Sequence, residues 1–387
     1  MVAIPSETEI LIAGAGPTGL ALCAELRRRG FEPLIVDKVA EGANTSRAVV
    51  IHARTLEVLE PLGLVPRLLE EGIRVPIFRV RDHDTALVTI DFKDIPSKYA
   101  FTLMCPQDRT EAVLLARLQA LGGEVVRPWE VTGLTTAGDR VRVTVMGDGS
   151  MRQVTARWVV GCDGLHSRVR EAAGIAFRGA EYEQTFALAD VRMDWPIPRE
   201  EVTLFFSPEG FFVVAPLPGD HYRMVAAADD VPREPTMEYV QAVLDSRGPK
   251  AHPGRVRQCL WSTRFHVHHR IAASPRKGRV LLCGDAAHVH SPAGGQGMNT
   301  GIQDAVTLAD VLADVLRGGD DARLDDWAAD RHRIAEGVVR LTDRMMRVAT
   351  LRSPPLRRLR NLAVAFAGHV PPLRRAVARR LAELNRR

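Results

Sequence analysis

The stretch Ile10-Leu-Ile-Ala-Gly-Ala-Gly-Pro-Thr-Gly19 decides the expected fold of the chain. An apolar run predicts a buried strand, and three glycines in the spacing Gly-x-Gly-x-x-Gly follow it directly. Gly14 allows a tight turn, Gly16 lets the backbone approach a pyrophosphate, and Gly19 lets a helix pack closely on the strand. The stretch therefore predicts the start of a dinucleotide-binding unit.

The residues after this fingerprint fit the same unit. A helix rich in alanine and leucine is expected over Leu20–Arg29, and a second strand over Leu34–Val36. Asp37 ends that strand and is placed to accept hydrogen bonds from ribose hydroxyls. Lys38 is either a phosphate or ribose contact or simply an exposed lysine. Strand, glycines, helix, strand and acid in this order favour a nucleotide site over a chance glycine-rich turn.

A second glycine-rich region lies near the other end of the chain, in Gly278–Asn299. Its strand, Val280–Cys283, ends in Gly284-Asp285, which places a carboxylate at the ligand-binding edge of a sheet. A helix that begins near Gly297 would present free backbone N–H groups to an anionic or polar ligand. An ordinary strand-to-helix connection is the simpler explanation when this region is considered alone.

Composition excludes several other classes of protein. Of the 387 residues, 46% are hydrophobic, which is ordinary for a globular protein with two or three domains. The five cysteines are scattered without metal-ligand spacing, so we expect reduced thiols in a cytoplasmic protein. We expect no signal peptide, because the first apolar run belongs to the fingerprint. We also expect no membrane span and no metal site, although His266 and His268 share one face of a predicted strand.

The net charge of +5 comes almost entirely from arginine, which gathers near the C-terminus. There it alternates with leucine and alanine, as on the solvated faces of amphipathic helices. This pattern favours solvated helices over a nucleic-acid groove. A helix at a membrane surface stays open as a less favoured alternative.

The pattern of elements predicts an α/β fold with an inserted, mainly antiparallel β-sheet domain and a helical C-terminus. We expect the Rossmann-like nucleotide-binding domain in two parts, with the substrate-binding sheet between them and a C-terminal helical segment last. The expected boundaries are 1–176, 177–275, 276–345 and 346–387. Asp163 and Asp285 flank the insertion, so both would meet one cofactor.

Over roughly its first 345 residues the chain resembles the FAD-dependent aromatic hydroxylases, the single-component flavoprotein monooxygenases related to para-hydroxybenzoate hydroxylase. It is most similar to their polyketide and phenol hydroxylase branch. The resemblance rests on ordered blocks: Gly14–Gly19 with Asp37, Ser46-Arg47-Ala48 with Arg54–Glu57, Cys105-Pro-Gln107 with Glu111, Gly161–Arg170, and the region around Gly284-Asp285.

The resemblance implies bound FAD, a transient NADPH or NADH, and O2. One oxygen atom would be inserted into an aromatic substrate through a flavin C4a-hydroperoxide, without a protein nucleophile or a named general base. We expect a monomer or homodimer that binds a small aromatic molecule and no nucleic acid. Many members continue into a thioredoxin-like domain, which we do not expect here. Where members often have Asn-Leu-x-Trp-Lys, this chain has Thr307–Val311.

The resemblance also assigns site residues. Arg47 and Gln107 would contact the diphosphate and ribityl region, Val131 the adenine, and Asp285 the ribityl hydroxyls. Pro292 and the backbone of Gly295–Asn299 would line the isoalloxazine ring of the flavin. Asp163 would touch the pyrophosphate, or cap the helix that follows it. The complete cofactor set is Gly14, Gly16, Pro17, Thr18, Gly19, Asp37, Lys38, Arg47, Gln107, Val131, Asp163, Asp285, Pro292, Gly295, Gly297, Met298 and Asn299.

The expected substrate pocket uses the aromatic residues of the inserted sheet. The candidates are Phe205, Phe206, Phe211, Phe212 and Pro216, although aromatic residues on strands are usually core. Other functions stay open on the same scaffold. They are a ubiquinone-pathway-type hydroxylase, a Baeyer–Villiger oxygenase, and a FAD-dependent non-redox catalyst or binder.

Overall fold

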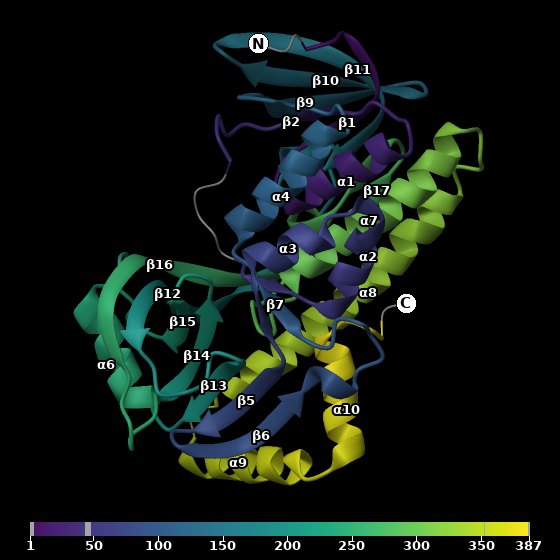
Figure 1. The fold of residues 1–387 in the computed structure, drawn as a ribbon. Coiled ribbons are helices and arrows are strands. Elements are labelled where there is room, and N and C mark those ends of the chain that lie inside the picture. Colours follow the sequence, from purple (N-terminus) through teal and green to yellow (C-terminus); the bar gives the residue numbers. More distant parts are fainter. Residues whose placement is uncertain (1–3, 43–47, 352, 386–387) are drawn as a thin grey trace.

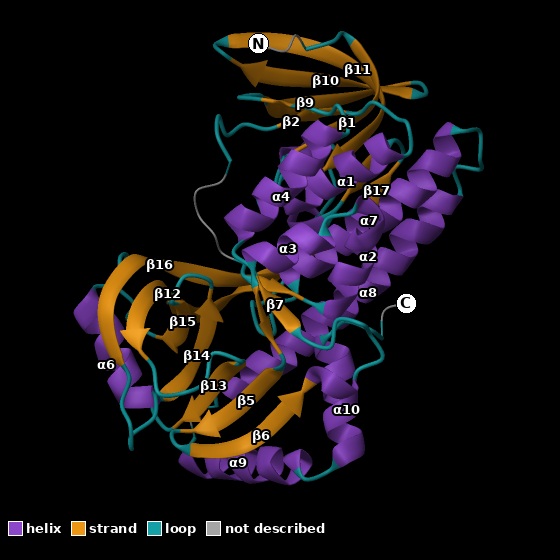
Figure 2. Cartoon of the chain, viewed as in Figure 1, coloured by secondary structure: helices purple, strands orange, loops and turns teal. Residues whose placement is uncertain are grey.

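The computed structural model describes residues 4–42, 48–351 and 353–385, and the side chains of residues 182–184 are outside this description. Two large sheets, a small third sheet and a helical layer make up the described part of the molecule (Figures 1 and 2). The helices are α1 Pro17–Arg28, α2 Ala53–Leu59, α3 Val65–Glu71, α4 Gln107–Ala120, α5 Arg168–Ala172, α6 Met237–Arg247, α7 Gly297–Leu316, α8 Arg323–Ala349, α9 Pro354–Gly368 and α10 Pro371–Leu381, with 3-10 turns at η1 Glu60–Leu62, η2 Phe92–Asp94 and η3 Gly284–Ala286.

The first sheet has the order β17-β18-β11-β1-β2-β8, and β10 and β9 extend it from β11. Its bounds are β1 Glu7–Ala13, β2 Leu34–Val36, β8 Val125–Val126, β9 Glu130–Ala137, β10 Arg140–Gly147, β11 Ser150–Gly161, β17 Arg276–Lys277 and β18 Val280–Leu282. Strands β1, β2, β8, β11 and β18 pair in parallel. On β1, Ile10 and Ile12 pack with α1 and α7, whereas Leu11 and Ala13 pack with β9 and β10. Burial on both faces explains why this strand is apolar throughout.

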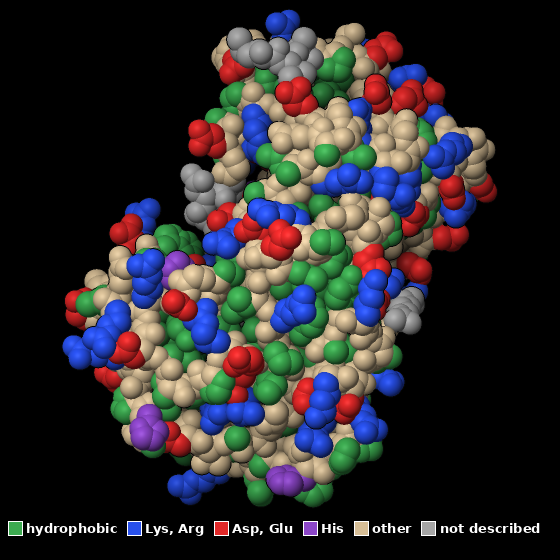
Figure 3. Space-filling view, in the orientation of Figure 1, with side chains coloured by type: hydrophobic (Ala, Val, Ile, Leu, Met, Phe, Trp, Pro, Cys, Tyr) green, Lys and Arg blue, Asp and Glu red, His purple; other side chains and the backbone are tan. Residues whose placement is uncertain are grey.

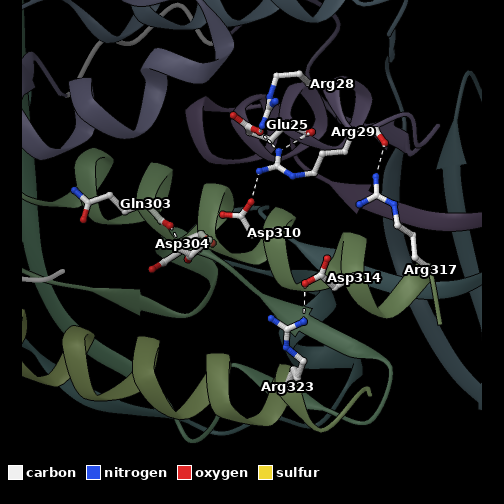
Figure 4. A network of polar contacts seen from close by, with 10 residues as sticks. Glu25, Arg28, Arg29, Gln303, Asp304, Asp310, Asp314, Arg317 and Arg323 are labelled. Carbon is white, nitrogen blue, oxygen red and sulfur yellow. Dashed lines mark hydrogen bonds and ion pairs between the residues drawn. The ribbon is translucent and has the colours of Figure 1, made fainter. Parts of the chain in front are cut away.

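A polar network holds the end of α1 against α7 (Figure 4). Glu25 is fully buried and pairs with Arg28 and with Arg29, and Arg29 reaches on to Asp310 of α7. Arg317 donates a hydrogen bond of 2.9 Å to the carbonyl of Arg29. The helix that begins with the fingerprint is therefore fixed at its far end to the helix that begins with the second glycine-rich region.

The second sheet has the order β19-β16-β12-β15-β14-β13-β5-β6 and is mainly antiparallel, as expected for the inserted domain. Its bounds are β5 Ile77–Asp82, β6 Thr85–Asp91, β12 Phe177–Asp194, β13 Glu201–Ser207, β14 Gly210–Leu217, β15 His221–Ala228, β16 Arg255–Ala272 and β19 His288–Val289. A small third sheet joins β3 Val50–Ile51, β7 Thr102–Met104 and β4 Ile73–Val75.

Two parts of the second sheet come from outside residues 177–275. Strand β5 pairs in parallel with β13, β6 extends the sheet beyond β5, and β19 pairs with β16. The expected domain of residues 177–275 leaves these strands out, because a short alternating run does not indicate which distant strand it will pair with. The expected division into four segments stays a prediction. Strands β5 and β6 belong to the first segment, 1–176, but join the sheet of the second, 177–275.

The C-terminal helices wrap around the outer strand β6 and return to the first domain (Figure 1). The sequence predicts amphipathic helices with arginines on their solvated faces there. The chain end itself is core: Leu381, Ala382 and Leu384 are buried, and Glu383 is fully buried. The Ala382 carbonyl accepts a hydrogen bond of 3.2 Å from the backbone N–H of Arg54. Among the described residues, no helix is both long enough and apolar enough to cross a membrane.

Candidate cofactor site

The fingerprint glycines have the geometry that their predicted roles require. Gly14 has φ +98°, and a Cβ there would lie 2.4 Å from the carbonyl oxygen of Cys162. A Cβ on Gly19 would lie 1.9 Å from the carbonyl oxygen of Gly14, so only glycine permits this contact of helix and strand. A Cβ on Gly16 would meet no protein atom within 4 Å. Gly16 therefore faces the open space in which a pyrophosphate would fit.

Asp37 holds the fingerprint loop in place. One carboxylate oxygen accepts a hydrogen bond of 2.6 Å from the backbone N–H of Ala15, and the other accepts one of 2.8 Å from Val39. The Arg127 guanidinium lies 3.3 Å from the same carboxylate. A carboxylate can accept about four hydrogen bonds. The predicted ribose contact is compatible with this geometry and stays a prediction.

A cavity of about 210 Å³ lies in front of the fingerprint. It brings together seven of the predicted residues, namely Gly14, Gly16, Asp37, Lys38, Gln107, Val131 and Asp163. It also includes residues that were not in the predicted set, among them Glu111, Arg127, Trp129, His166 and Arg168. Arg127 and Trp129 follow strand β8, which pairs with β2. A prediction that β8 lies next to β2 would have placed both residues at the same edge of the sheet as Asp37. Arg47 lies outside the described residues.

Gln107 begins α4 and joins two segments at the cavity. Its side-chain oxygen accepts a hydrogen bond of 3.2 Å from the backbone N–H of Ala48, and its Nε2 donates one of 2.8 Å to Glu111. Burial raises the pKa of Glu111, and the hydrogen bond from Gln107 opposes that shift. The negative charge of Glu111 is thus costly in this position, and its carboxyl mainly orients the Gln107 amide.

Asp163 caps the helix that follows it, which is one of the two roles that the sequence leaves open. It accepts a hydrogen bond of 2.5 Å from the Ser167 hydroxyl and one of 3.1 Å from the backbone N–H of Val169. Burial raises the pKa of Asp163, and the hydrogen bond from Ser167 opposes that effect. The pyrophosphate contact stays a prediction, supported by the position of Asp163 on the cavity wall.

The two glycine-rich regions are in direct contact. A Cβ on Gly284 would lie 2.7 Å from the Thr18 hydroxyl, and a Cβ on Gly301 would lie 2.5 Å from it. Thr18 therefore packs between the turn at the end of β18 and the first turns of α7. Asp285 follows Gly284 and is exposed. Regions more than 260 residues apart thus converge, as one extended cofactor requires.

A buried cluster of charged residues holds the turn at Gly284 in place. Asp304 of α7 is 2% exposed and accepts hydrogen bonds from Arg331 (2.6 Å), His288 (2.7 Å) and the backbone N–H of Gly284 (3.1 Å). Burial alone would raise the pKa of Asp304, but Arg331 and then His288 outweigh it and hold the pKa at about 2. In this cluster His288 has a structural role, because it helps to hold the Asp304 carboxylate.

Asn299 fixes the predicted flavin loop with its side chain. Its amide donates to the carbonyls of Val50 (2.8 Å) and Gly295 (2.7 Å), and its oxygen accepts from the backbone N–H of His52 (2.8 Å). Gly295 has φ +64°, and a Cβ there would lie 2.6 Å from Val50. The predicted loop residues are therefore held near β3, at the start of α7. Pro292, Gly297 and Met298 belong to the same segment, and their flavin contacts stay predictions.

The predicted pocket residues lie on two different faces of the second sheet. Phe205 and Phe212 are fully buried in a cluster with α6, and Pro216 follows Phe212 with the same strand alternation. Phe206 and Phe211 lie on the other face, in a cluster that includes Ala293 of the glycine-rich loop. Phe206 and Phe211 are also buried. All five pocket assignments therefore stay predictions, and the contact of the second cluster with Ala293 favours Phe206 and Phe211 among them.

These features fit FAD: a glycine-lined cavity for the ADP half, and a second loop in contact with it for the flavin half. Residues 7–342 match the model of a family described as an FAD binding domain. The chain belongs to this family. Its solved relatives include the OxyS anhydrotetracycline hydroxylase from Streptomyces rimosus, which is 35% identical with a TM-score of 0.83, over 98% of this chain and 76% of that one.

Curated relatives agree. The chain is 37% identical to 6-methylpretetramide 4-monooxygenase of Streptomyces rimosus over 96% of its own length and 68% of the relative's. It is 35% identical to pentachlorophenol 4-monooxygenase of Sphingobium chlorophenolicum over 88% of its own length and 64% of the relative's. The protein is an FAD-dependent monooxygenase with an α/β fold, as predicted, and NAD(P)H is the reductant typical of its family. The alternative functions are not favoured.

Proposed function

We propose that this monooxygenase hydroxylates a phenolic or polyketide-type aromatic molecule between the second sheet and the glycine-rich loop. The relatives named above act on a pretetramide and on a chlorinated phenol. The observation that carries the location is the pair Phe206 and Phe211, which face each other across β13 and β14 with ring centroids 6.2 Å apart. They cluster with Phe186, Phe265 and Ala293, so buried aromatic side chains adjoin the predicted flavin loop.

The residues of the chain have three tasks in this proposal. The fingerprint, Asp37 and Gln107 hold the ADP half of FAD, and Asp285 holds the ribityl chain. Bound FAD supplies the activation of O2. The N-terminus of α7, near Gly297, directs partial positive charge at the flavin edge and stabilises negative charge there. Phe206 and Phe211 exclude water and hold the aromatic ring flat by offset stacking.

The test compares neighbouring phenylalanines on opposite faces. Phe206→Ala and Phe211→Ala should raise KM for an accepted aromatic substrate and divert NAD(P)H oxidation towards H2O2. Phe205→Ala, with an equally large side chain removed, should lower stability by roughly 3–5 kcal/mol and leave coupling unchanged in the folded enzyme. Equal loss of coupling in Phe205→Ala and Phe206→Ala would place the pocket elsewhere.

Isotope labelling tests the reaction itself. Turnover under ¹⁸O2 should put one labelled atom on an aromatic carbon of the product and the other into water. Label found only in water or peroxide across phenols, quinones and ketones would reject oxygen insertion. Label between a carbonyl and its neighbouring carbon would instead assign Baeyer–Villiger chemistry.

A further inference from the structure

Helix α9 turns polar side chains towards the protein, which is the reverse of an ordinary surface helix. Its arginine Arg360 is only 6% exposed and donates to the carbonyls of Phe206 (2.9 Å) and Ala349 (3.0 Å). Asn361 also points inward and donates a hydrogen bond of 2.8 Å to Asp82. Surface helices normally bury their apolar side and expose their polar side. Here polar residues anchor the helix to the protein.

The outward side of α9 is correspondingly apolar. Leu359, Leu362 and Phe366 are 62%, 69% and 73% exposed, and Leu356 is 49% exposed. Spacings of three and four residues place these side chains along one stripe of the helix. Large apolar side chains scattered singly on a surface are normal, but a contiguous stripe marks an interaction site. On α10, Leu373 and Val377 are also exposed. We call these six side chains the α9–α10 apolar face.

The charged side chains that α9 and α10 themselves carry have one sign. From Arg344 to Leu381 the sequence contains ten arginines and no aspartate or glutamate, and the next acid, Glu383, is fully buried. The exposed arginines of α9 and α10 are Arg358, Arg374, Arg375, Arg379 and Arg380. Figure 3 shows basic and hydrophobic side chains together at the lower end of the molecule, where Figure 1 places α9 and α10.

We propose that the α9–α10 apolar face, with its exposed arginines, docks on a membrane surface of anionic phospholipid. Apolar side chains beside arginines are the combination that interfacial helices use: the former enter the boundary of headgroups and acyl chains, and the latter attract the headgroup charge. A second copy of the chain fits less well, because a two-fold contact would place the arginine-rich helices of both copies, which carry no acidic residue, against each other.

Vesicle co-sedimentation of the FAD-loaded protein tests this proposal. Phosphatidylcholine vesicles that contain phosphatidylglycerol should bind the protein, and pure phosphatidylcholine should bind it much more weakly. Added salt should weaken the binding. Arg374→Gln with Arg375→Gln should reduce the partition coefficient about 25-fold, from about fivefold per arginine. Leu362→Ser with Phe366→Ser should abolish binding, while FAD content stays that of the unchanged protein.

Matched controls lie at the opposite end of the molecule, on the β10–β11 hairpin (Figure 1). Met151 is 63% exposed, like Leu359, and Arg152 beside it is exposed. Met151→Ser and Arg152→Gln should leave vesicle binding unchanged. Equal binding to both vesicle types, or undiminished binding of the α9–α10 variants, would overturn the proposal. So would a dimer in sedimentation velocity that Leu362→Ser with Phe366→Ser dissociates, with no vesicle binding, because the face would then join two copies.

Discussion

Replacing Asp304 by asparagine should destabilise the protein strongly while changing almost no volume. The Asp304 carboxylate is buried and is shared by Arg331, His288 and the backbone N–H of Gly284. Asparagine keeps the shape but leaves the buried Arg331 guanidinium without its countercharge. Breaking a buried ion pair on one side costs about 3–5 kcal/mol. Because Asp304 also holds Gly284, FAD should be released more readily from the folded variant.

The pH dependence has a definite sign. The folded-state pKa of Asp304 is about 2, below the ordinary value of 3.8, so the folded state favours the charged form. The corresponding stabilisation, about 2 kcal/mol, is complete above the unfolded-state pKa and is lost as pH falls from about 4 towards 2. Asp304→Asn should remove this part of the acid sensitivity.

Guanidinium unfolding monitored by circular dichroism measures both effects, with Asp314→Asn as the matched control. Asp314 is also on α7 and pairs with Arg323 at 2.6 Å, but both side chains are about half exposed. A pair of that kind contributes about 0–1 kcal/mol. If Asp304→Asn cost no more than Asp314→Asn, the buried cluster would not support the turn in the way described.

Four further substitutions test the folding and the cofactor binding of the site. Gly16→Ala should keep the fold and lose FAD, since its Cβ would meet only open space, whereas Gly19→Ala should disrupt both the fold and FAD binding. Circular dichroism and flavin absorbance would distinguish the two variants. A Gly16→Ala protein that retains its FAD would contradict the pyrophosphate assignment. Asp285→Ala should weaken FAD binding about 10- to 100-fold through loss of a charge-assisted hydrogen bond, measured by flavin fluorescence titration, and unchanged affinity would remove Asp285 from the site. Glu111→Gln should stabilise the FAD-free protein at pH 8 and much less at pH 4. Burial raises the folded-state pKa of Glu111, so the contribution of this carboxyl to stability is lost as pH rises through that pKa. Equal effects of the substitution at both pH values would argue against this reasoning.

The local geometry of the fingerprint could be predicted from the sequence, because each requirement there is local. The fingerprint glycines must sit at fixed spacings after a strand, and Asp37 must end the next one. Strand Leu34–Val36 forms with the predicted bounds, and α1 begins at Pro17 within the fingerprint. Even the tight contact of Gly19 with Gly14 follows from that spacing.

The remaining features depend on partners far apart in the chain. The backbone of Gly295–Asn299 is predicted to line the flavin, and this stays a prediction. The side chain of Asn299 bonds Val50 and His52, almost 250 residues away. The buried partner of Asp304, Arg331, lies on another helix and looks in sequence like any surface arginine. No local pattern contains either pairing. Likewise β5 and β6 carry no signal that they will join β13.

The register of β13 against β14 has a practical consequence for anyone who wishes to alter the range of molecules the enzyme accepts. Phe205 pairs with Phe212, and Phe206 with Phe211, so consecutive letters of the sequence alternate between two separate layers. In a mutant library that randomises all four positions together, two of the positions, Phe205 and Phe212, change the core that packs against α6. Restricting the library to Phe206, Phe211 and Val213 directs the variation to the side that meets the glycine-rich loop, and leaves Phe205 and Phe212 to keep the scaffold folded.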